Sequence, residues 1–315
     1  MAKRILAITL VFALALGVAA CGGGGGDDGE AKGPVVVGSK IDTEGGVLGQ
    51  MVIALLEENG FTVEDKTKTG ATTVVRAALE AGEIDIYPEY TGTALTQFFP
   101  DAQINASVSK DAAASYETVK SLDEENGITW LARAPANNTW AIAIPEALAE
   151  ENTIVSFTDW AEYINAGNDV KLVCSQEFAD RDDALPAFEA AYGFELTSDQ
   201  LIILAGGDTA QTAAAASQGT NGANAAMVYG TDGSIAALGL VVLEDPAGVQ
   251  PVYEPAPTIR TEVLDQWPEI AEILDPVFSE LTLKTLQILN GKVAVDGQDP
   301  KTVAREYLQT AGYIE

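Results

Sequence analysis

A regular alternation between short apolar runs and helical patterns constrains the fold of this chain most strongly. The runs 35–38, 61–66 and 83–87 are typical of strands, since they are rich in β-branched residues or alternate between apolar and polar residues. Helical patterns occupy 47–58 and 72–81, and each stops close to a glycine. The order strand, helix, strand, helix, strand predicts a mostly parallel sheet covered by helices.

The same alternation returns in the middle of the chain. Further strands are predicted at 140–144, 169–174, 201–204 and 225–229. Further helices are predicted at 94–99, 111–126, 157–166, 184–192 and 209–217, and a helical C-terminal third at 268–279, 283–290 and 300–310. The residue pattern alone therefore predicts two α/β units.

The N-terminus predicts export and a lipid anchor. Lys3 and Arg4 precede an apolar run over 5–16, which is too short to span a bilayer as a mature helix. Residues 18–21 read VAAC and look like a bacterial lipobox, in which Cys21 carries the acyl chains. The alternative, a plain secretory signal that ends in Ala-x-Ala, leaves Cys21 unexplained. We therefore expect a signal peptide over 1–20, a flexible Gly/Asp tether over 21–33, and an extracytoplasmic protein anchored to the cell membrane.

Composition excludes several functions. The net charge of −30 argues against nucleic-acid binding, which needs basic surface. The chain has no His, and Cys174 is the only Cys besides Cys21, so we expect Cys174 to be a buried apolar residue. No metal-ligand cluster, Ser-His-Asp set or phosphate loop is present. Three acidic residues could suggest acid–base chemistry, but no nucleophile accompanies them, and we interpret them as structural: Glu83, Asp85 and Glu89. The sequence thus predicts no metal, no cofactor and no catalytic residue.

Two segments carry a resemblance to a known family. In the first, residues 35–40 read VVVGSK, Thr43 and Glu44 follow, and residues 82–93 read GEIDIYPEYTGT. In the second, residues 229–233 read YGTDG. From residue 35 to about residue 308 the chain resembles the glycine betaine/choline-binding proteins of osmoprotectant ABC importers. The YTGT run directly after a strand-like IDIY is the most specific part of this resemblance.

The resemblance implies a two-lobed α/β fold of the type II periplasmic-binding-protein kind, with a hinge and a ligand cleft between the lobes. It places lobe I in 34–136, lobe II in 137–243, and a return to lobe I in 244–315. The implied partners are a small betaine-type ligand and the permease and ATPase subunits of an ABC importer.

The resemblance also implies the ligand-binding residues. In the family, a cage of aromatic rings holds the trimethylammonium head, and basic and hydroxyl groups meet the carboxylate. The cage positions are Tyr90, Trp140, Tyr229 and Tyr253, and the carboxylate positions are Lys40, Thr93 and Arg181. The chain departs from the family pattern at Asp42, where an aromatic residue is usual, at Gly45, where Gln is usual, and at Trp140, where Tyr is usual.

These residue types suit a quaternary ammonium that carries a carboxylate. The cation has no N–H to donate, and aromatic faces match both its charge and its methyl groups. Arg181 offers a planar fork for a carboxylate, and choline, which has none, would leave Arg181 and Lys40 unpaired in a closed cleft. Glycine betaine or proline betaine is therefore the expected ligand. A solvated charge cluster over 180–183 is the competing interpretation of Arg181.

Other functions stay open at this level. The protein could bind choline, carnitine or an amino acid, or it could report a solute to a receptor instead of delivering it for uptake. An enzyme with acidic cleft residues is the alternative from another class. The effect of the Gly/Asn-rich loop 218–224 on the cleft is not defined by the sequence.

Overall fold

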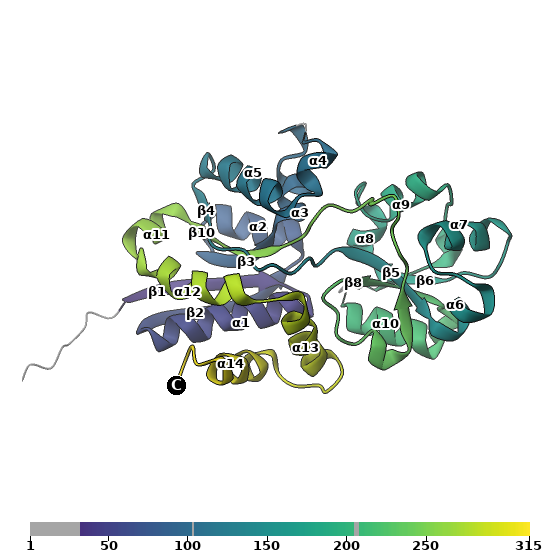
Figure 1. Cartoon of the computed structure of the whole chain (residues 1–315). Helices are drawn as coiled ribbons and strands as arrows, with labels where there is room; N and C mark the ends of the chain where they lie inside the picture. Colours follow the sequence, from purple (N-terminus) through teal and green to yellow (C-terminus); the bar gives the residue numbers. More distant parts are fainter. Residues whose placement is uncertain (1–31, 103, 205–207) are drawn as a thin grey trace, which may run out of the picture. The chain divides into compact units, whose positions relative to one another are not determined.

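Two five-stranded sheets organise the computed structural model, which describes residues 32–102, 104–204 and 208–315 (Figure 1). We call the unit built on the first sheet lobe I and the unit built on the second sheet lobe II. In lobe I the strand order is β2 (Phe61–Gly70), β1 (Lys32–Lys40), β3 (Ile86–Tyr90), β10 (Pro255–Arg260), β4 (Ile128–Trp130). In lobe II the order is β7 (Leu201–Leu204), β6 (Leu172–Ser175), β8 (Ala225–Tyr229), β5 (Trp140–Pro145), β9 (Leu240–Val242).

Helices connect and cover the strands. Those of lobe I are α1 (Thr43–Glu58), α2 (Thr72–Glu80), α3 (Thr91–Thr93), α4 (Ala106–Ser109), α5 (Ala112–Glu124), α11 (Thr261–Gln266), α12 (Glu269–Glu280), α13 (Leu283–Ala294) and α14 (Pro300–Ala311). Those of lobe II are α6 (Glu146–Asn152), α7 (Phe157–Asn165), α8 (Gln176–Asp180), α9 (Leu185–Tyr192) and α10 (Thr209–Gln218). A π-helical turn over Ala94–Phe98 and short 3-10 turns at Pro100–Ala102, Ser198–Gln200, Thr220–Gly222 and Ala236–Leu238 complete the elements.

Both sheets are mixed, although the pattern predicted a mostly parallel one. In lobe I, β1 pairs parallel with β2 and β3, but β10 pairs antiparallel with β3 and β4. In lobe II, β6 pairs parallel with β7 and β8, but β5 pairs antiparallel with β8 and β9. The strands β5 and β10, which introduce the antiparallel pairs, are those that enter a sheet after the chain has crossed between lobes. The two-lobed α/β fold class itself is confirmed.

Period-two alternation gives each sheet two buried faces. In β1, Val35 and Val37 join the core beneath α1, α12, α13 and α14, whereas Val36 faces the α2 side. Figure 1 shows these two groups of helices on opposite sides of the lobe I sheet. In β5, Ile142 packs toward α7, α8 and α9, and Ala143 packs toward α10. Because both faces are covered, the strand ends are the part of each sheet left to meet the other lobe.

The third strand begins later than predicted. It spans Ile86–Tyr90, not 83–87. The backbone N–H groups of Glu83 and Ile84 still donate to Ala78 O at the end of α2. The Asp85 carboxylate accepts from Val36 N and pairs with Arg260, in addition to the backbone bond from Asp85 N to Val36 O. Glu83 and Asp85 thus precede the strand that was predicted to contain them, and a structural role for Asp85 agrees with its ion pair.

The sequence pattern missed β4, β9 and β10. Of these, β10 carries two prolines, which usually argue against a strand inside a sheet. Pro257 lies opposite Pro88 of β3, which also has no backbone N–H. The carbonyl groups of Pro255 and Pro257 accept from Ala134 N and Leu131 N instead. These bonds fix the chain where it crosses from lobe I to lobe II.

The chain crosses between the sheets twice, between β4 and β5 and between β9 and β10. The two crossings are bonded to each other, because Asn138 N donates to Tyr253 O and Tyr253 N donates to Asn137 Oδ1, each at 2.8 Å. The lobe boundaries predicted from the resemblance stay a prediction. Cys21, the signal peptide and most of the tether lie outside the described residues.

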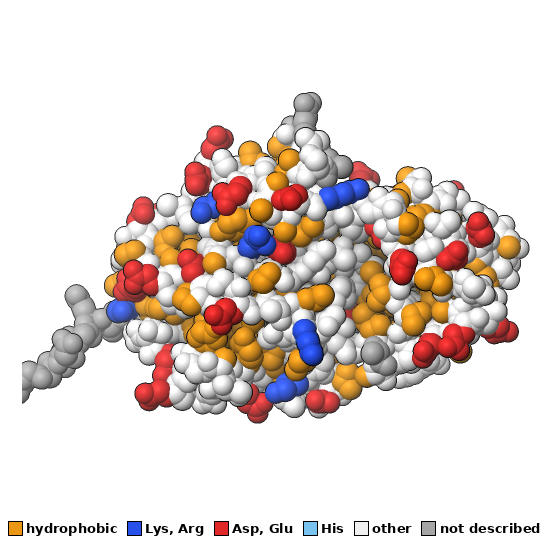
Figure 2. All heavy atoms as spheres, viewed as in Figure 1, with side chains coloured by type: hydrophobic (Ala, Val, Ile, Leu, Met, Phe, Trp, Pro, Cys, Tyr) orange, Lys and Arg blue, Asp and Glu red, His pale blue; other side chains and the backbone are white. Residues whose placement is uncertain are grey.

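The structure also shows the surface charge and the surroundings of the Cys174 thiol. Acidic side chains are spread over the face shown in Figure 2, and basic ones are fewer. Cys174 is buried and unpaired, and burial raises the pKa of its thiol to about 12, as suits an apolar core residue. Among the described residues, no helix has the length and apolar character needed to cross a membrane.

Candidate ligand-binding site

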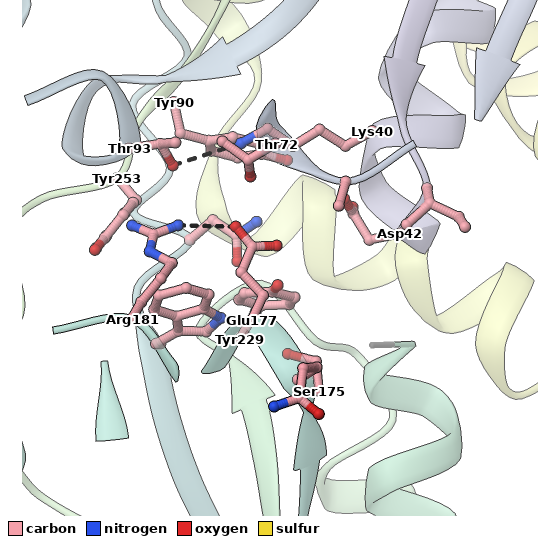
Figure 3. A pocket seen from close by; sticks show the side chains of 15 residues that line it. Lys40, Asp42, Thr72, Tyr90, Thr93, Ser175, Glu177, Arg181, Tyr229 and Tyr253 are labelled. Atoms are coloured by element: carbon pink, nitrogen blue, oxygen red, sulfur yellow. Dashed lines mark hydrogen bonds and ion pairs between the residues drawn. The ribbon is translucent and has the colours of Figure 1, made fainter. Parts of the chain in front are cut away.

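A cavity of about 250 Å³ lies between the lobes, at the ends of strands from both sheets (Figure 3). This volume is slightly below the roughly 300–1,000 Å³ of most small-molecule pockets, so it suits a small solute. All seven residues predicted to bind ligand line this cavity. The complete lining is Lys40, Ile41, Asp42, Ala71, Thr72, Tyr90, Thr93, Asn138, Trp140, Ser175, Gln176, Glu177, Arg181, Tyr229 and Tyr253.

The aromatic side chains come from strand ends and from the crossing. Trp140 opens β5 and lies directly opposite Tyr229, the last residue of β8. Their rings are 6.3 Å apart and nearly parallel, at 16°. The ring of Tyr253, on the second crossing, is 6.1 Å from that of Trp140. Tyr90 ends β3 and reaches the cavity from lobe I. The structure therefore gathers the four predicted rings around one space, and their part in ligand binding stays a prediction.

Lys40 is already paired inside lobe I. Its ammonium Nζ lies 2.6 Å from Glu89 Oε1, and both side chains are buried. The same Nζ donates to Thr93 Oγ1 at 3.5 Å and lies 4.9 Å from the centre of the Tyr90 ring. In Figure 3, Lys40, Tyr90 and Thr93 form the lobe I side of the pocket, facing Arg181, Glu177 and Tyr229 of lobe II.

Arg181 is paired with two carboxylates of lobe II. It follows α8 directly, and its guanidinium contacts Asp183 at 2.6 Å and Glu177 at 3.0 Å. A further bond reaches Thr96 Oγ1 of lobe I at 3.1 Å. The guanidinium also lies 4.4 Å from the ring centre of Trp140, within the range of a cation–π contact. The side chain is only 9% exposed, so the solvated-cluster interpretation is wrong.

These ion pairs correct one sequence argument. A ligand without a carboxylate was expected to leave Lys40 and Arg181 unpaired, but both cations have carboxylate partners in the protein. Burial acts to raise the pKa of Asp183, but hydrogen bonding to Arg181 and the charge of that residue outweigh burial, so the pKa lies below its usual value. A ligand carboxylate is therefore not needed to neutralise either cation.

Two carboxyl groups that contact the tyrosines of the site, Glu44 and Asp232, have no cationic partner in the described part of the chain. Glu44 is buried at the start of α1, and its Oε1 accepts from the Tyr90 hydroxyl at 2.9 Å. Asp232 follows β8 and accepts from Tyr229 N at 2.8 Å. Burial raises the pKa of Glu44 to about 7 and that of Asp232 to about 7, because hydrogen bonds offset desolvation only in part. Burial also raises the pKa of Asp42, which lines the cavity.

Sequence reasoning missed several of these residues as parts of the site. Glu44 stood inside the quoted family motif and Asn138 stands two residues before Trp140, so both had a positional signal. Asp183 was interpreted only as part of the charge cluster 180–183, and Glu177, four residues before Arg181, lies outside the quoted motifs. Their proximity to the cavity depends on the turn after α8, which the residue pattern does not specify.

A cavity lined from two lobes that are joined by paired crossings defines a two-lobed substrate-binding protein. The chain belongs to the family described as the substrate-binding domain of ABC-type glycine betaine transport systems, whose model matches residues 33–310. This is an extracytoplasmic family of binding proteins and not of enzymes, which confirms the predicted class.

The similar proteins agree with this assignment. The glycine betaine-binding protein YehZ of Escherichia coli K12 is 53% identical over 287 residues, which cover 91% of this chain and 93% of the relative. A glycine-betaine-binding protein of Pseudomonas aeruginosa is 34% identical, over 87% of this chain and 86% of its own. The solved structure of apo YehZ covers 89% of this chain and 99% of its own, with a TM-score of 0.65.

Proposed function

We propose that this protein captures a betaine, glycine betaine or proline betaine, and delivers it to the permease of an ABC importer. The observation that carries the proposal is the set of four rings, from both lobes, around one small cavity. One cation–π contact contributes about 0.5–2 kcal/mol, so several rings approach the roughly −8 kcal/mol of a micromolar complex. The names of the two bacterial relatives support the same ligand class.

The ligand bridges the lobes in this proposal. The quaternary ammonium lies among Tyr90, Trp140, Tyr229 and Tyr253, and the carboxylate meets Lys40, Thr93 and Arg181. Four of the five guanidinium N–H groups of Arg181 donate to described residues, which leaves one donor at Nη1. Lys40 Nζ has two described partners and three N–H groups. Each cation thus keeps one donor for a carboxylate. Contacts split in this way favour closure of the lobes around the ligand.

The test is a titration of the purified protein with glycine betaine, proline betaine, choline and carnitine, followed by Trp fluorescence. Trp140 is 5% exposed at the edge of the cavity, so its emission is expected to change on binding. Micromolar binding of a betaine supports the proposal. Binding of an amino acid, with no betaine bound below millimolar concentration, overturns it. If choline binds as tightly as the betaines, the proposed recognition of a ligand carboxylate is wrong, and the rest of the proposal stands.

We also propose that Cys21 carries the lipid that anchors the protein to the membrane. The support is the sequence VAAC at 18–21 followed by a glycine-rich tether. Mass spectrometry of protein expressed in a bacterial host tests this. A diacylglyceryl adduct on Cys21 and release of Cys21→Ala from the membrane fraction are expected. An unmodified Cys21 in mature protein overturns the anchor and leaves the binding function untouched.

A further inference from the structure

Glu44 occupies an unusual place under the pocket. It is the second residue of α1, is 3% exposed, and has no ion-pair partner among the described residues. Its Oε1 accepts from the Tyr90 hydroxyl and from Asn138 Nδ2, each at 2.9 Å. Tyr90 and Asn138 both line the cavity, so a single side chain separates Glu44 from the ligand space.

The other carboxylate oxygen ties Glu44 to the second lobe. Glu44 Oε2 accepts from Asn290 Nδ2 of α13 at 2.7 Å. The same amide nitrogen donates to Thr231 O, in the turn that follows β8 of lobe II, at 3.1 Å. Glu44 is thus bonded to lobe I through Tyr90, to the crossing through Asn138, and indirectly to lobe II through Asn290.

A buried carboxylate bonded only to neutral donors is costly to ionise. Burial raises the pKa of Glu44 to about 7, although its hydrogen bonds act in the opposite direction. The ammonium group of Lys40 lies over the Tyr90 ring and is paired with Glu89. A cation placed inside the ring of aromatic side chains would be the charge that Glu44 lacks.

We propose that Glu44 is the buried counter-charge for the quaternary-ammonium head and a specificity-determining residue of the pocket. It acts through space and through Tyr90, whose hydroxyl it fixes, and is not itself a wall of the cavity. The inference rests on the proposed function, because it assumes a ligand with a cationic head. The aromatic rings recognise the shape and methyl surface of this head, and Glu44 distinguishes its charge from that of a neutral head of the same shape.

The groups that face Glu44 define how its charge responds to pH. From its own end of lobe I these are Asp42 and the Tyr90 hydroxyl, and from the turn after β8 they are the Thr231 hydroxyl and Asp232. The crossing and α13 present the amides of Asn138 and Asn290. Both acidic neighbours disfavour ionisation of Glu44, and a bound cation favours it. Ligand binding is therefore expected to release a proton below about pH 7.

The experiment compares two ligands of one shape across pH. The two ligands have the same shape, but the head of glycine betaine has a charged quaternary nitrogen where 3,3-dimethylbutanoate has a neutral quaternary carbon. Their Kd values are measured by calorimetry between about pH 5.5 and 8, for the wild type and Glu44→Gln. The wild-type Kd for glycine betaine is expected to tighten about tenfold as pH rises through 7. Glu44→Gln is expected to lose most of this slope and about tenfold of the preference for glycine betaine at pH 8.

The Glu44→Gln variant can keep the local hydrogen bonds. The Oδ1 atoms of Asn138 and Asn290 have no hydrogen-bond partner in the described part of the chain, so a rotated amide can accept from the side-chain nitrogen that Glu44→Gln introduces. Should Glu44→Gln fail to fold, Glu44→Asp keeps the charge and is expected to keep the pH slope. Glu189→Gln is the matched control: Glu189 lies in lobe II outside the cavity, and burial raises the pKa of its carboxyl too.

Each result decides the inference. Loss of slope and of head-group preference in Glu44→Gln, with both retained in Glu189→Gln, supports it. An unchanged slope in Glu44→Gln, or a slope that disappears only in Asp232→Asn, overturns it while the betaine function stands. A folded Glu44→Asp without the slope also overturns it. If the wild type binds no quaternary ammonium at any pH, the proposed function fails, and this inference fails with it.

Discussion

The positive and negative groups at the pocket differ in whether the protein itself neutralises them. Lys40 has Glu89, and Arg181 has Glu177 and Asp183. Glu44 and Asp232 have only neutral donors among the described residues. The cations are thus satisfied before a ligand arrives, and the two carboxyls beneath the rings are not.

This difference changes the expected basis of ligand selection. Sequence reasoning placed the selectivity in cations that wait for a carboxylate. The structure instead leaves two carboxyl groups without a cation among the described residues, close to aromatic rings, and we propose that both features favour a cationic ligand. In the proposed function, a ligand carboxylate adds contacts to donors that remain on Lys40 and Arg181, and it does not cancel a bare charge. The predictions below alter one side of this comparison at a time.

The largest effect is expected from removing the cation of a buried pair. In Lys40→Met, Glu89 keeps bonds from the Tyr87 hydroxyl and Tyr90 N but loses its counter-charge in a fully buried position. The free energy of unfolding is expected to fall by about 3–5 kcal/mol, because an uncompensated buried charge remains. Urea denaturation followed by circular dichroism measures this.

A surface pair provides the control for Lys40→Met. Lys66 pairs with Glu64 at 3.4 Å, and both side chains are about half exposed. Lys66→Met is expected to cost less than about 1 kcal/mol. Adding Glu89→Gln to Lys40→Met is expected to recover much of the loss. Equal stability of Lys40→Met and Lys66→Met would contradict the view that the pocket cation is neutralised by Glu89.

The aromatic side of the pocket is tested by Trp140→Leu. Leucine keeps an apolar group but removes the indole face, so the Kd for glycine betaine is expected to weaken about tenfold, within the roughly 0.5–2 kcal/mol of a cation–π contact. Calorimetry is the suitable measurement, because the variant loses the fluorescent reporter. Tyr163→Leu, which removes a partly buried ring of the same lobe outside the cavity, is expected to leave the Kd unchanged. Similar losses in both variants would assign the effect to stability of lobe II.

Most of the architecture was accessible from the sequence because periodicity encodes which faces are buried. The valines of β1 and the alternation in β5 marked real two-sided strands, and α7 begins and ends within one residue of its prediction. The strand β10 escaped because Pro255 and Pro257 contradict local strand preference. Its place depends on pairing with β3, which lies far earlier in the chain, on the other side of all of lobe II. Long-range pairing of this kind leaves no local pattern.

The candidate site also has features that the sequence predicted and features that it could not predict. Lys40, Tyr90, Thr93 and Tyr229 were found because they stand in the motif segments. Trp140, Arg181 and Tyr253 were found from the wider family resemblance, and all seven residues reach one cavity. Which charges are paired could not be predicted, since Lys40 meets Glu89 and Arg181 meets Asp183 only through side-chain geometry. The pKa of Glu44 is likewise a result of burial beneath Tyr90, and a glutamate in the first turn of a helix ordinarily suggests an exposed helix-capping charge.

The smallest change in ligand affinity is expected from Arg181→Gln, and it bears on which ligand the pocket prefers. Loss of the guanidinium removes one donor for a carboxylate, frees the face of Trp140, and leaves Glu177 and Asp183 without their cation. Glycine betaine is expected to bind a few-fold to tenfold more weakly, whereas choline, which has a cation and no carboxylate, is expected to bind equally or more tightly. The ratio of the two Kd values, measured by calorimetry, reports this change independently of overall stability. Arg305→Gln, which alters an exposed pair with Glu57, serves as the control and is expected to leave the ratio unchanged. Equal losses for both ligands would mean that Arg181 only supports the lobe II side of the pocket, and selection for a betaine would then depend on Lys40 and Thr93.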